Sequence, residues 1–390
     1  MKVYARHHRF ATRRAEAGMS LLEVLVALGI GLVLIAGVTQ LFIGSNQAFL
    51  ARDQLARMQE NIRFISERLQ RDIRMAGYQG CAPSVNDLLD STDAAYTGQP
   101  YVFDGTPVMG WEYAGSAIGN ALILDDLGAS EAANWTNGVT PALPFTLPAG
   151  GILPGSDVLM VKRSARHDVA VTDVTNGGTP NIQMTAAEPA IAENMTVVLV
   201  DNNCRVADKF QRTNDNDEDS IERAAGAAPG NATPLANWSN ALVGSVSSPA
   251  TLPVSVYTLE SELYYIRNNP DDIPSLYSVR LGPSGGATQE LITGVENMQV
   301  LYGISTGAPD DVVNNYVPAN AVTDFDDVLA VRVAFLMRST ELANTENTLV
   351  TYVLAGTNVT RMDVAVAGNE GDRFLRLSST ITVGLRNQLR

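Results

Sequence analysis

A single carboxylate, Glu23, lies near the start of an apolar run that ends at Ile43, and Gly18 comes directly before that run. A charged side chain in the core of a bilayer costs roughly 2.5–3.5 kcal/mol on insertion scales. A chain that carries such a cost usually has a use for the charge, such as pairing with a positive group where the dielectric constant is low. A peptidase that cuts after the small pair Ala17-Gly18 would leave a new amino group on Met19, one helical turn from Glu23.

The leader before Gly18 is basic. It carries five basic residues against Glu16 alone and therefore has a net charge of +4; they are Lys2, Arg6, Arg9, Arg13 and Arg14. Positive residues that flank a first apolar helix hold that flank in the cytoplasm. We therefore expect one membrane-spanning helix with its N-terminus inside and everything after about residue 45 outside. A secretory signal has its small-residue cleavage site after the apolar stretch, and no A-x-A-like site follows Ile43.

The glycine, the apolar residue after it and the glutamate match a known pattern. Gly18, Met19 and Glu23 resemble the type IV prepilin signature, in which glycine precedes the cut bond and glutamate is fifth in the mature chain. Three further segments resemble the PilW family of minor pilins: MQENIRFISERLQRDIRMAGYQGC (58–81), LITGVENMQVLYGI (291–304), and DVLAVRVAFLMRS (327–339) with the closing FLRLSSTITVGLRN (374–387).

The resemblance implies an α+β, pilin-like fold. In that fold a long N-terminal helix, transmembrane in its first half and amphipathic in its second, packs on an antiparallel β-sheet with large loops. The boundaries expected here are a cleaved leader at 1–18, a transmembrane half at 19–44, an amphipathic half at 45–80, and a β-rich periplasmic or extracellular body at 81–390. Within the body, residues 206–250 are polar and rich in Ala, Asn and Gly, and we expect a long exposed loop insertion there.

The resemblance also implies a function. Prepilin peptidase would cut between Gly18 and Met19, Met19 would be N-methylated, and Glu23 would set the register of subunits during assembly. The protein would act as a minor pilin that helps to initiate pilus assembly at the tip, supporting twitching motility and adhesion. Its partners would be other minor pilins, the major pilin and a large tip adhesin. It would reside in the inner membrane before assembly and at the pilus tip on the cell surface afterwards.

Two other functions fit the same N-terminal residues. A J-type pseudopilin of type II secretion shares the signature, although the 291–304 and 374–387 segments favour the pilus family. A membrane-tethered periplasmic enzyme or binding protein could carry the motif by accident, with Glu23 lying near the lipid headgroups. The mature N-terminus separates this last reading from the first two.

Bulk composition limits the partners of the body. The chain has a net charge of −15, so removal of the +4 leader leaves −19. Binding to nucleic acid needs clustered Lys and Arg, so this negative charge argues against direct nucleic-acid binding.

Two cysteines, Cys81 and Cys204, would both lie in an oxidising compartment where disulfides persist. We expect the two cysteines to form a disulfide, and the alternative is two buried thiols. A metal site would have few ligands, because the chain has no other cysteine and only His167 after the leader.

Periodicity predicts the elements that position these residues. Apolar residues recur every three or four positions between Leu55 and Ala76, as on one face of a helix, and Gly77 is a suitable stop. Residues 20–76 would then form one helix. Runs rich in Val, Ile, Tyr and Thr predict strands at 156–164, 195–201, 254–266, 275–281, 289–304, 327–338 and 374–386, with short strands near 100–113 and 120–126. The remainder of 82–155 is expected to be mostly loop, and the strand count leaves room for a second sheet.

Other chemical motifs are weak. Residues 282–286 spell G-x-S-x-G, but a strand-like run follows where a nucleophile elbow requires a helix, so a hairpin turn is the better interpretation. Asp215, Asp217 and Asp219 alternate as in a calcium loop but lack the glycine and distal glutamate of an EF-hand, so a solvated loop is favoured; Asp310, Asp311, Asp324, Asp326 and Asp327 have the same status. No P-loop, GxGxxG, HExxH or CxxC motif occurs. We expect neither an enzyme nor a cofactor.

Overall fold

The fold was analysed in a computed structural model, which describes residues 19–93, 96, 106–139, 143, 151–226, 228–245, 252–282, 286–307, 312–362 and 371–387. The leader, including Gly18, lies outside these residues. The chain divides into two compact units, Met1–Arg52 and Asp53–Arg390, and each is described by itself.

The N-terminal helix α1 (Leu21–Arg74) agrees with the single helix predicted over 20–76. In the unit Met1–Arg52 its described side chains are mostly exposed and apolar. In the unit Asp53–Arg390 it is amphipathic, and Met58, Ile65, Leu69 and Ile73 are buried in the core. Gly77 follows the helix with a φ of +76°, the left-handed conformation that commonly ends a helix at glycine.

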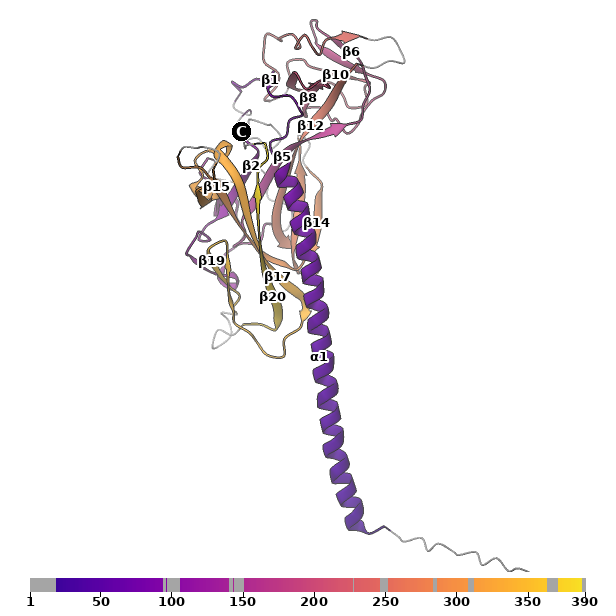
Figure 1. Cartoon of the computed structure of the whole chain (residues 1–390), viewed down its shortest axis with the longest axis vertical. Coiled ribbons are helices and arrows are strands. Elements are labelled where there is room, and N and C mark those ends of the chain that lie inside the picture. The colour runs from indigo at the N-terminus through magenta and orange to yellow at the C-terminus, as the bar shows by residue number, and fades with distance from the viewer. Residues whose placement is uncertain are drawn as a thin grey trace, which may run out of the picture. The chain divides into compact units, whose positions relative to one another are not determined.

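The strands of the unit Asp53–Arg390 form four sheets in the described part of the chain (Figure 1). The largest has nine described strands. Its main path, in spatial order, is β1 (Val85–Asp87), β9 (Ala207–Gln211), β8 (Thr196–Asp201), β12 (Val254–Asn268), β5 (Val158–His167), β2 (Val108–Tyr113) and β4 (Trp135–Thr136), and β13 (Pro274–Leu281) joins β12 to β14 (Thr288–Thr293).

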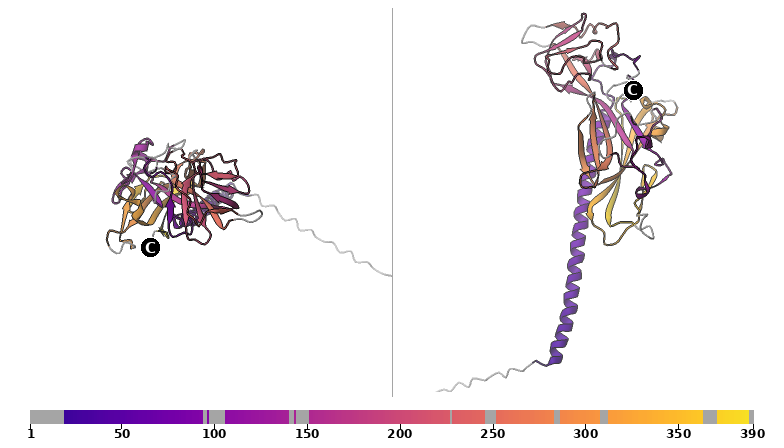
Figure 2. Two further views of the ribbon diagram at one scale, coloured as in Figure 1. Left: turned by 90° about the horizontal axis from the view of Figure 1, so that it is seen from above. Right: turned by 180° about the vertical axis from the view of Figure 1, so that it is seen from behind.

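A second sheet is built from the strands of the C-terminal part of the chain, which are orange to yellow in Figures 1 and 2. Among the described residues its order is β16 (Asn315–Pro318), β15 (Val295–Ile304), β17 (Val328–Leu342) and β20 (Phe374–Gly384). Side chains of the helix, the nine-stranded sheet and this sheet share one hydrophobic core. Burial of apolar surface in this core, at about 25 cal/mol per Å², is the main force that holds the second half of the helix on the body.

Two smaller sheets complete the body. Within the described ranges one contains β10 (Ser220–Glu222), β7 (Asn181–Met184), β6 (Val171–Thr175) and β11 (Gly244–Ser245), and the other contains β18 (Thr351–Leu354), β19 (Thr357–Thr360) and β3 (Ala121–Ile123). Short 3-10 helices lie at Leu124–Asp126, Ala132–Asn134, Ala319–Ala321 and Phe325–Asp327.

The expectation of an exposed loop insertion at 206–250 was wrong for the described residues of that range, 206–226 and 228–245; residues 227 and 246–250 lie outside the described part of the chain. This region supplies β9, β10 and β11. Phe210, Ile221, Trp238 and Leu242 are buried in a second hydrophobic core with residues of β6, β7 and β8. The ring of Trp238 packs edge-on against Phe210 with a centroid distance of 4.7 Å. The apolar residues are too widely spaced in the sequence to show a period of two, so their burial depends on contacts with distant strands.

The predicted strands of the C-terminal half are present, but one of them is divided into two strands. The run 289–304 forms two strands in different sheets, β14 and β15, which separate at Gly294. Gly294 has a φ of +85°, and a Cβ there would lie 2.6 Å from the carbonyl oxygen of Arg338. The sheets are also not purely antiparallel, because β1 pairs with β9 and β19 pairs with β3 in parallel.

Candidate assembly site on the N-terminal helix

The first turn of α1 brings Glu23 next to the helix start. The backbone N–H of Glu23 donates to the hydroxyl oxygen of Ser20 at 3.2 Å, so Ser20 acts as the N-cap of the helix. Ser20 and Glu23 have the spacing S-x-x-E of a capping box. Met19 and Glu23 are both exposed, and Gly18, the other half of the predicted cleavage site, lies outside the described residues.

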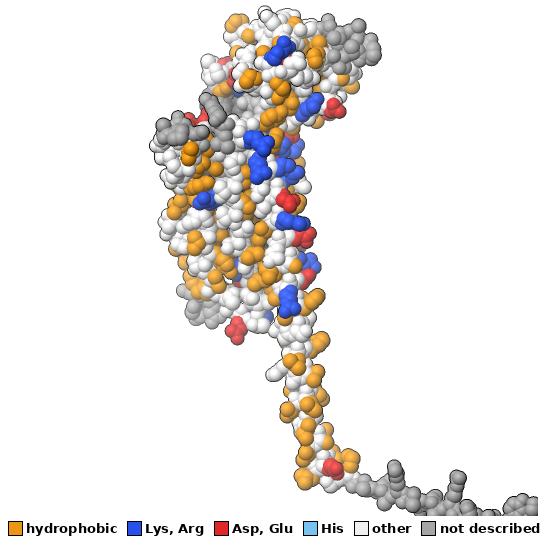
Figure 3. Space-filling model, in the orientation of Figure 1, with side chains coloured by type: hydrophobic (Ala, Val, Ile, Leu, Met, Phe, Trp, Pro, Cys, Tyr) orange, Lys and Arg blue, Asp and Glu red, His pale blue; other side chains and the backbone are white. Residues whose placement is uncertain are grey.

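The helix that follows exposes a long apolar surface. The large apolar side chains from Leu21 to Ile43 are exposed throughout, and Figure 3 shows them covering the described N-terminal part of the helix. By length and composition this helix could cross a membrane. Exposed apolar patches of this extent mark membrane or protein contacts, so the surface requires lipid or other helices around it.

The second half of the helix carries a buried charge that periodicity did not reveal. Asp72 lies on the buried face between Leu69 and Ile73, and its side chain is almost completely inaccessible to solvent. Its carboxylate accepts hydrogen bonds from Arg68 at 2.8 Å and from the hydroxyl of Tyr264 on β12. Because a buried charge is costly unless it is paired, these partners make Asp72 compatible with the core.

The ion pairs continue onto the sheet. Arg68 also donates to Glu262 at 2.7 Å, and Arg163 on β5 lies 3.2 Å from Glu260 and 3.7 Å from Asp72. Burial, together with the negative charges of Glu262 and Asp72, raises the pKa of Tyr264 and keeps it protonated as a donor. This network fixes the rotation and height of the helix on the sheet, since the bonds are directional where apolar contacts are not.

The end of the helix is tied to three parts of the body. The N–H of Gly77 donates to the carbonyl of Lys162 at 2.9 Å, and the side-chain amide of Asn387 donates to the carbonyl of Ala76 at 2.8 Å. Cys81 forms the predicted disulfide with Cys204 in the turn between β8 and β9. These bonds therefore fix the C-terminal end of the helix and the path of the chain that follows it.

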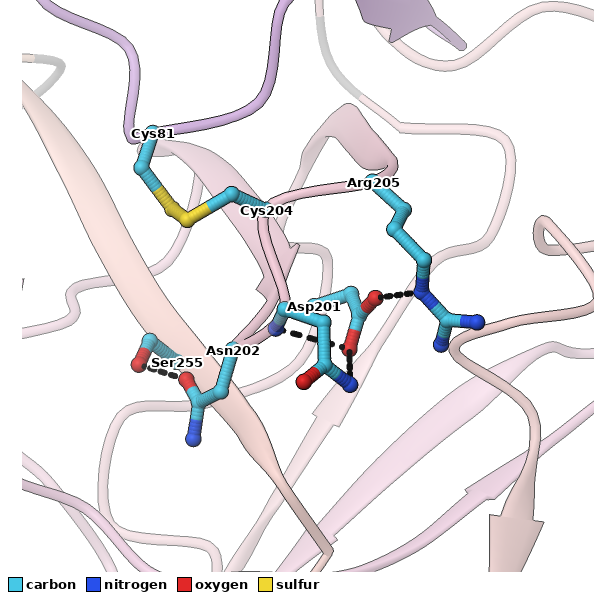
Figure 4. Close-up of a disulfide and its surroundings, with 7 residues drawn as sticks. Cys81, Asp201, Asn202, Cys204, Arg205 and Ser255 are labelled. Carbon is cyan, nitrogen blue, oxygen red and sulfur yellow. Dashed lines mark hydrogen bonds and ion pairs between the residues drawn. A yellow bond between two sulfur atoms is a disulfide. The ribbon is translucent and has the colours of Figure 1, made fainter.

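The turn that carries Cys204 is itself braced by hydrogen bonds (Figure 4). Asp201 accepts from the backbone N–H of Asn203 at 3.2 Å and pairs with Arg205 at 2.6 Å. The hydroxyl of Ser255 on β12 donates to Asn202 at 2.5 Å. These contacts fix the turn at the position that Cys81 reaches.

The possible calcium site at Asp215, Asp217 and Asp219 is not formed. All three residues are exposed, and among the described residues no group of three His, Cys, Asp or Glu side chains is placed to hold a metal ion. The loop is instead built around the buried Arg212, which donates to the carbonyl oxygens of Asp215 and, at 2.5 Å, Ile191. Burial lowers the pKa of Arg212.

The other motifs have structural roles where they are described. Gly282 and Gly286 lie in the connection between the antiparallel strands β13 and β14, and residues 283–285 lie outside the described residues. Asp310 and Asp311 also lie outside them. Asp324 accepts a hydrogen bond from the N–H of Asp326 at 2.9 Å and caps a 3-10 helix.

A buried carboxyl pair connects the two main sheets. Asp157 accepts from the backbone N–H groups of Tyr113 on β2 at 3.0 Å and Val300 on β15 at 2.8 Å. The single hydroxyl of Ser116 lies within hydrogen-bond distance of both carboxyls, 3.0 Å from Glu112 and 3.2 Å from Asp157. Burial raises the pKa of Glu112 to about 7. Burial and the nearby charge of Glu112 raise the pKa of Asp157 well above its usual value.

Sequence reasoning missed Ser20, Asp72 and this carboxyl pair for different reasons. The S-x-x-E spacing was readable and could have identified the cap. Asp72 could have been noticed as a charge on the apolar face, four residues after Arg68. Glu112 and Asp157 meet only through sheet pairing, and no local signal marks them.

Two family comparisons match this chain. Residues 263–387 match the family of the type IV pilus-assembly protein W, PilW, and residues 13–39 match the prokaryotic N-terminal methylation motif. The first match begins at Leu263 within β12 and continues through β20, and the second covers the predicted cleavage site, Glu23 and the start of α1. Comparison with curated proteins and with solved structures gave no match. Together with the long apolar helix and the β-rich body, these two matches support a PilW-family pilin that carries the prepilin signature.

Proposed function

We propose that this pilin is a minor pilin of the type IV pilus that helps to initiate assembly at the pilus tip. The proposal rests chiefly on one observation. The helix presents exposed apolar side chains from Leu21 to Ile43 with a single carboxylate, Glu23, in its first turn. Prepilin peptidase would cut between Gly18 and Met19, and the new amine of Met19 would be N-methylated.

Glu23 would pair with a free Met19 amine, in its own chain or in the next subunit. Both charges would lie among apolar side chains, where the dielectric constant is low and an unpaired charge is costly. A shift of one subunit along the filament would break the pair, so the pair would set the axial register. The other apolar side chains would replace lipid contacts with contacts between helices.

The size of the body favours the tip over the shaft. The unit Asp53–Arg390 contains all four sheets and all three hydrophobic clusters of the described chain. Such a body is bulky for close repetition around a filament. The proposed partners are other minor pilins, the major pilin and a large tip adhesin, and the proposed role is structural, supporting twitching and adhesion without a cofactor.

The basic leader supports an N-in orientation in the inner membrane before assembly. After extraction from the membrane, the body would lie at the tip, outside the cell. A J-type pseudopilin would share the helix, but the match of residues 263–387 to PilW supports the pilus.

Two substitutions in the full-length chain test the proposal. Gly18→Ala should block cleavage and leave a membrane-bound precursor, whereas Glu23→Ala should be cleaved but enter pili poorly. Mass spectrometry of the N-terminus and the amount of protein in sheared pili measure the two steps, with Glu23→Asp as the control that keeps the charge. An intact leader in the functional wild type, normal assembly of Glu23→Ala, or recovery with type II secretion components would contradict the proposal.

A further inference from the structure

The strand β20 has one edge paired and one edge open. It pairs with β17 and is the last strand of its sheet in the described part of the chain. Within the described ranges no strand pairs with its other side. An open edge presents unpaired backbone N–H and C=O groups, which are a template for another strand.

The direction of these groups follows from two hydrogen bonds. Leu375 donates its N–H to the hydroxyl of Ser339, and Leu385 donates its N–H to the carbonyl of Leu329, both on the β17 side. In an antiparallel ladder, successive residues point their backbone groups alternately toward and away from the partner strand. The odd-numbered residues of β20 therefore bond to β17, and the even-numbered residues point outward.

Among the described residues nothing protects the outward side of the strand in the usual way, and we call residues 378–384 the open edge. Ser378, Thr380, Thr382 and Gly384 are all exposed and each presents an N–H and a C=O. Edge strands are normally protected by lysine, proline, a bulge or a covering segment. The sequence SSTITVG contains no charge and no proline, and the register of β17 with β20 is regular from Ala330 to Arg338.

We infer that the open edge of β20 is a strand-addition site for an extended segment of another pilus component. The inference deepens the proposed function and rests on it for the identity of the partner. Main-chain hydrogen bonds supply affinity in such complexes, and side chains at alternate positions supply specificity. The two faces of β20 therefore determine which segment fits.

The two faces of β20 differ in chemistry. Ile381 and Val383 are buried in the core that contains the helix residues Met58 and Ile65, whereas Thr380 and Thr382 are exposed. An added strand would continue both faces. The fitting segment is uncharged, about six or seven residues long at roughly 3.3 Å per residue, and alternates aliphatic residues with Ser, Thr or Gly.

A second copy of this chain fits less well. In a membrane or filament whose subunits point the same way, two β20 strands would meet in parallel, related by a two-fold axis along the strands. That rotation places the buried face of one sheet beside the exposed face of the other. A strand from a different subunit does not have this conflict, because its apolar side chains can lie on the buried face.

Amide hydrogen exchange on the full-length protein in detergent tests the first step. We expect the amides of Thr380 and Thr382 to exchange much faster than those of Ile381 and Val383, because only the latter bond to β17. Equal, slow exchange of all four amides would show that the edge is already covered and would overturn the inference.

A proline on the outward side tests the partner. Thr380→Pro removes an outward N–H and leaves the ladder to β17 intact, since proline is tolerated on an edge strand whose N–H faces solvent. In cells, we expect about a tenfold loss of co-purified pilus components, equivalent to about 1.4 kcal/mol, and no loss with Thr380→Ser. Formation of the Cys81–Cys204 disulfide reports on folding, and Thr380→Lys gives the same test through charge if the proline variant is poorly folded.

Photo-cross-linking identifies the occupant. A photoreactive residue at Thr382 should give a product with a pilus component that maps to an extended, uncharged segment, whereas one at the exposed Asn216 should not. Unchanged recovery of partners with both Thr380→Pro and Thr380→Lys, or a product with only a second copy of this chain, overturns the inference. Failure of the proposed function gives a different result, in which the wild type itself is absent from pili while the exchange and cross-linking measurements still report on the edge.

Discussion

Asp72 on the helix accepts a hydrogen bond from the hydroxyl of Tyr264 on β12, inside the core. This contact joins two residues that are 192 positions apart in the chain. It couples the helix to the longest strand of the nine-stranded sheet, together with the bonds of Arg68 to Asp72 and Glu262. This network is the directional part of the connection between the second half of the helix and the sheet.

Removal of the buried carboxylate should therefore destabilise the body strongly. Asp72→Ala leaves Arg68 without one partner and Tyr264 without its acceptor, and we expect a loss of roughly 3–5 kcal/mol. Tyr264→Phe should cost less, about 1–2 kcal/mol. Denaturant unfolding of the full-length protein in detergent measures both.

The exposed pair of Asp53 and Arg57, at 2.9 Å on the same helix, provides the control. Arg57→Gln should change stability by less than about 1 kcal/mol, because exposed ion pairs contribute little. Equal effects of Asp72→Ala and Arg57→Gln would contradict the role assigned to the network.

The disulfide should stabilise the body chiefly by restricting the unfolded chain. It closes a loop of 123 residues, for which the chain-entropy model gives about 4–5 kcal/mol. The double variant Cys81→Ser with Cys204→Ser should unfold at lower denaturant and should be degraded faster in cells. Each single variant should lose as much stability as the double, and a double variant as stable as the wild type would show that the crosslink contributes nothing.

The carboxyl pair of Glu112 and Asp157 should make stability depend on pH. Burial raises the pKa of Glu112 to about 7 in the folded protein, above its value in the unfolded chain. The folded state then binds the proton more tightly, so this contribution is fully present below about pH 4.5 and is lost as the pH rises toward 7.

Glu112→Gln should flatten that part of the stability profile. The change expected in the wild type is roughly 2–3 kcal/mol across this window, measured as the denaturant midpoint at a series of pH values. A variant with Glu218, which is exposed, replaced by Gln should keep the wild-type slope. An unchanged slope in Glu112→Gln would argue against the pair as its source.

The cap at Ser20 should organise the first helical turn. Ser20→Ala removes the acceptor of the N–H of Glu23 and should cost about 1 kcal/mol of local stability. Ser20→Thr retains a hydroxyl and should behave as the wild type. Amide exchange of Glu23 in detergent measures the effect, and equal exchange in all three proteins would contradict the cap.

Local sequence determined the parts of this protein whose signals are contiguous. The apolar run, Glu23 and the basic leader are adjacent in the chain, and the spacing of Met58, Ile65, Leu69 and Ile73 is that of one helix face. The long strands β12, β15, β17 and β20 are likewise rich in β-branched and aromatic residues over many positions. The helix and these strands could be predicted because they depend on short-range periodicity, which a single sequence displays.

Tertiary structure decided everything that depends on residues meeting from distant segments. The burial of Trp238 and Phe210, the pairing of Glu112 with Asp157, and the partners of Asp72 arise from sheet order and register, which no local pattern encodes. The open edge of β20 has the same origin, because whether a strand is central or at an edge depends on which other strands are its neighbours. A buried charge or an unpaired backbone group becomes costly or useful only once those neighbours are in place.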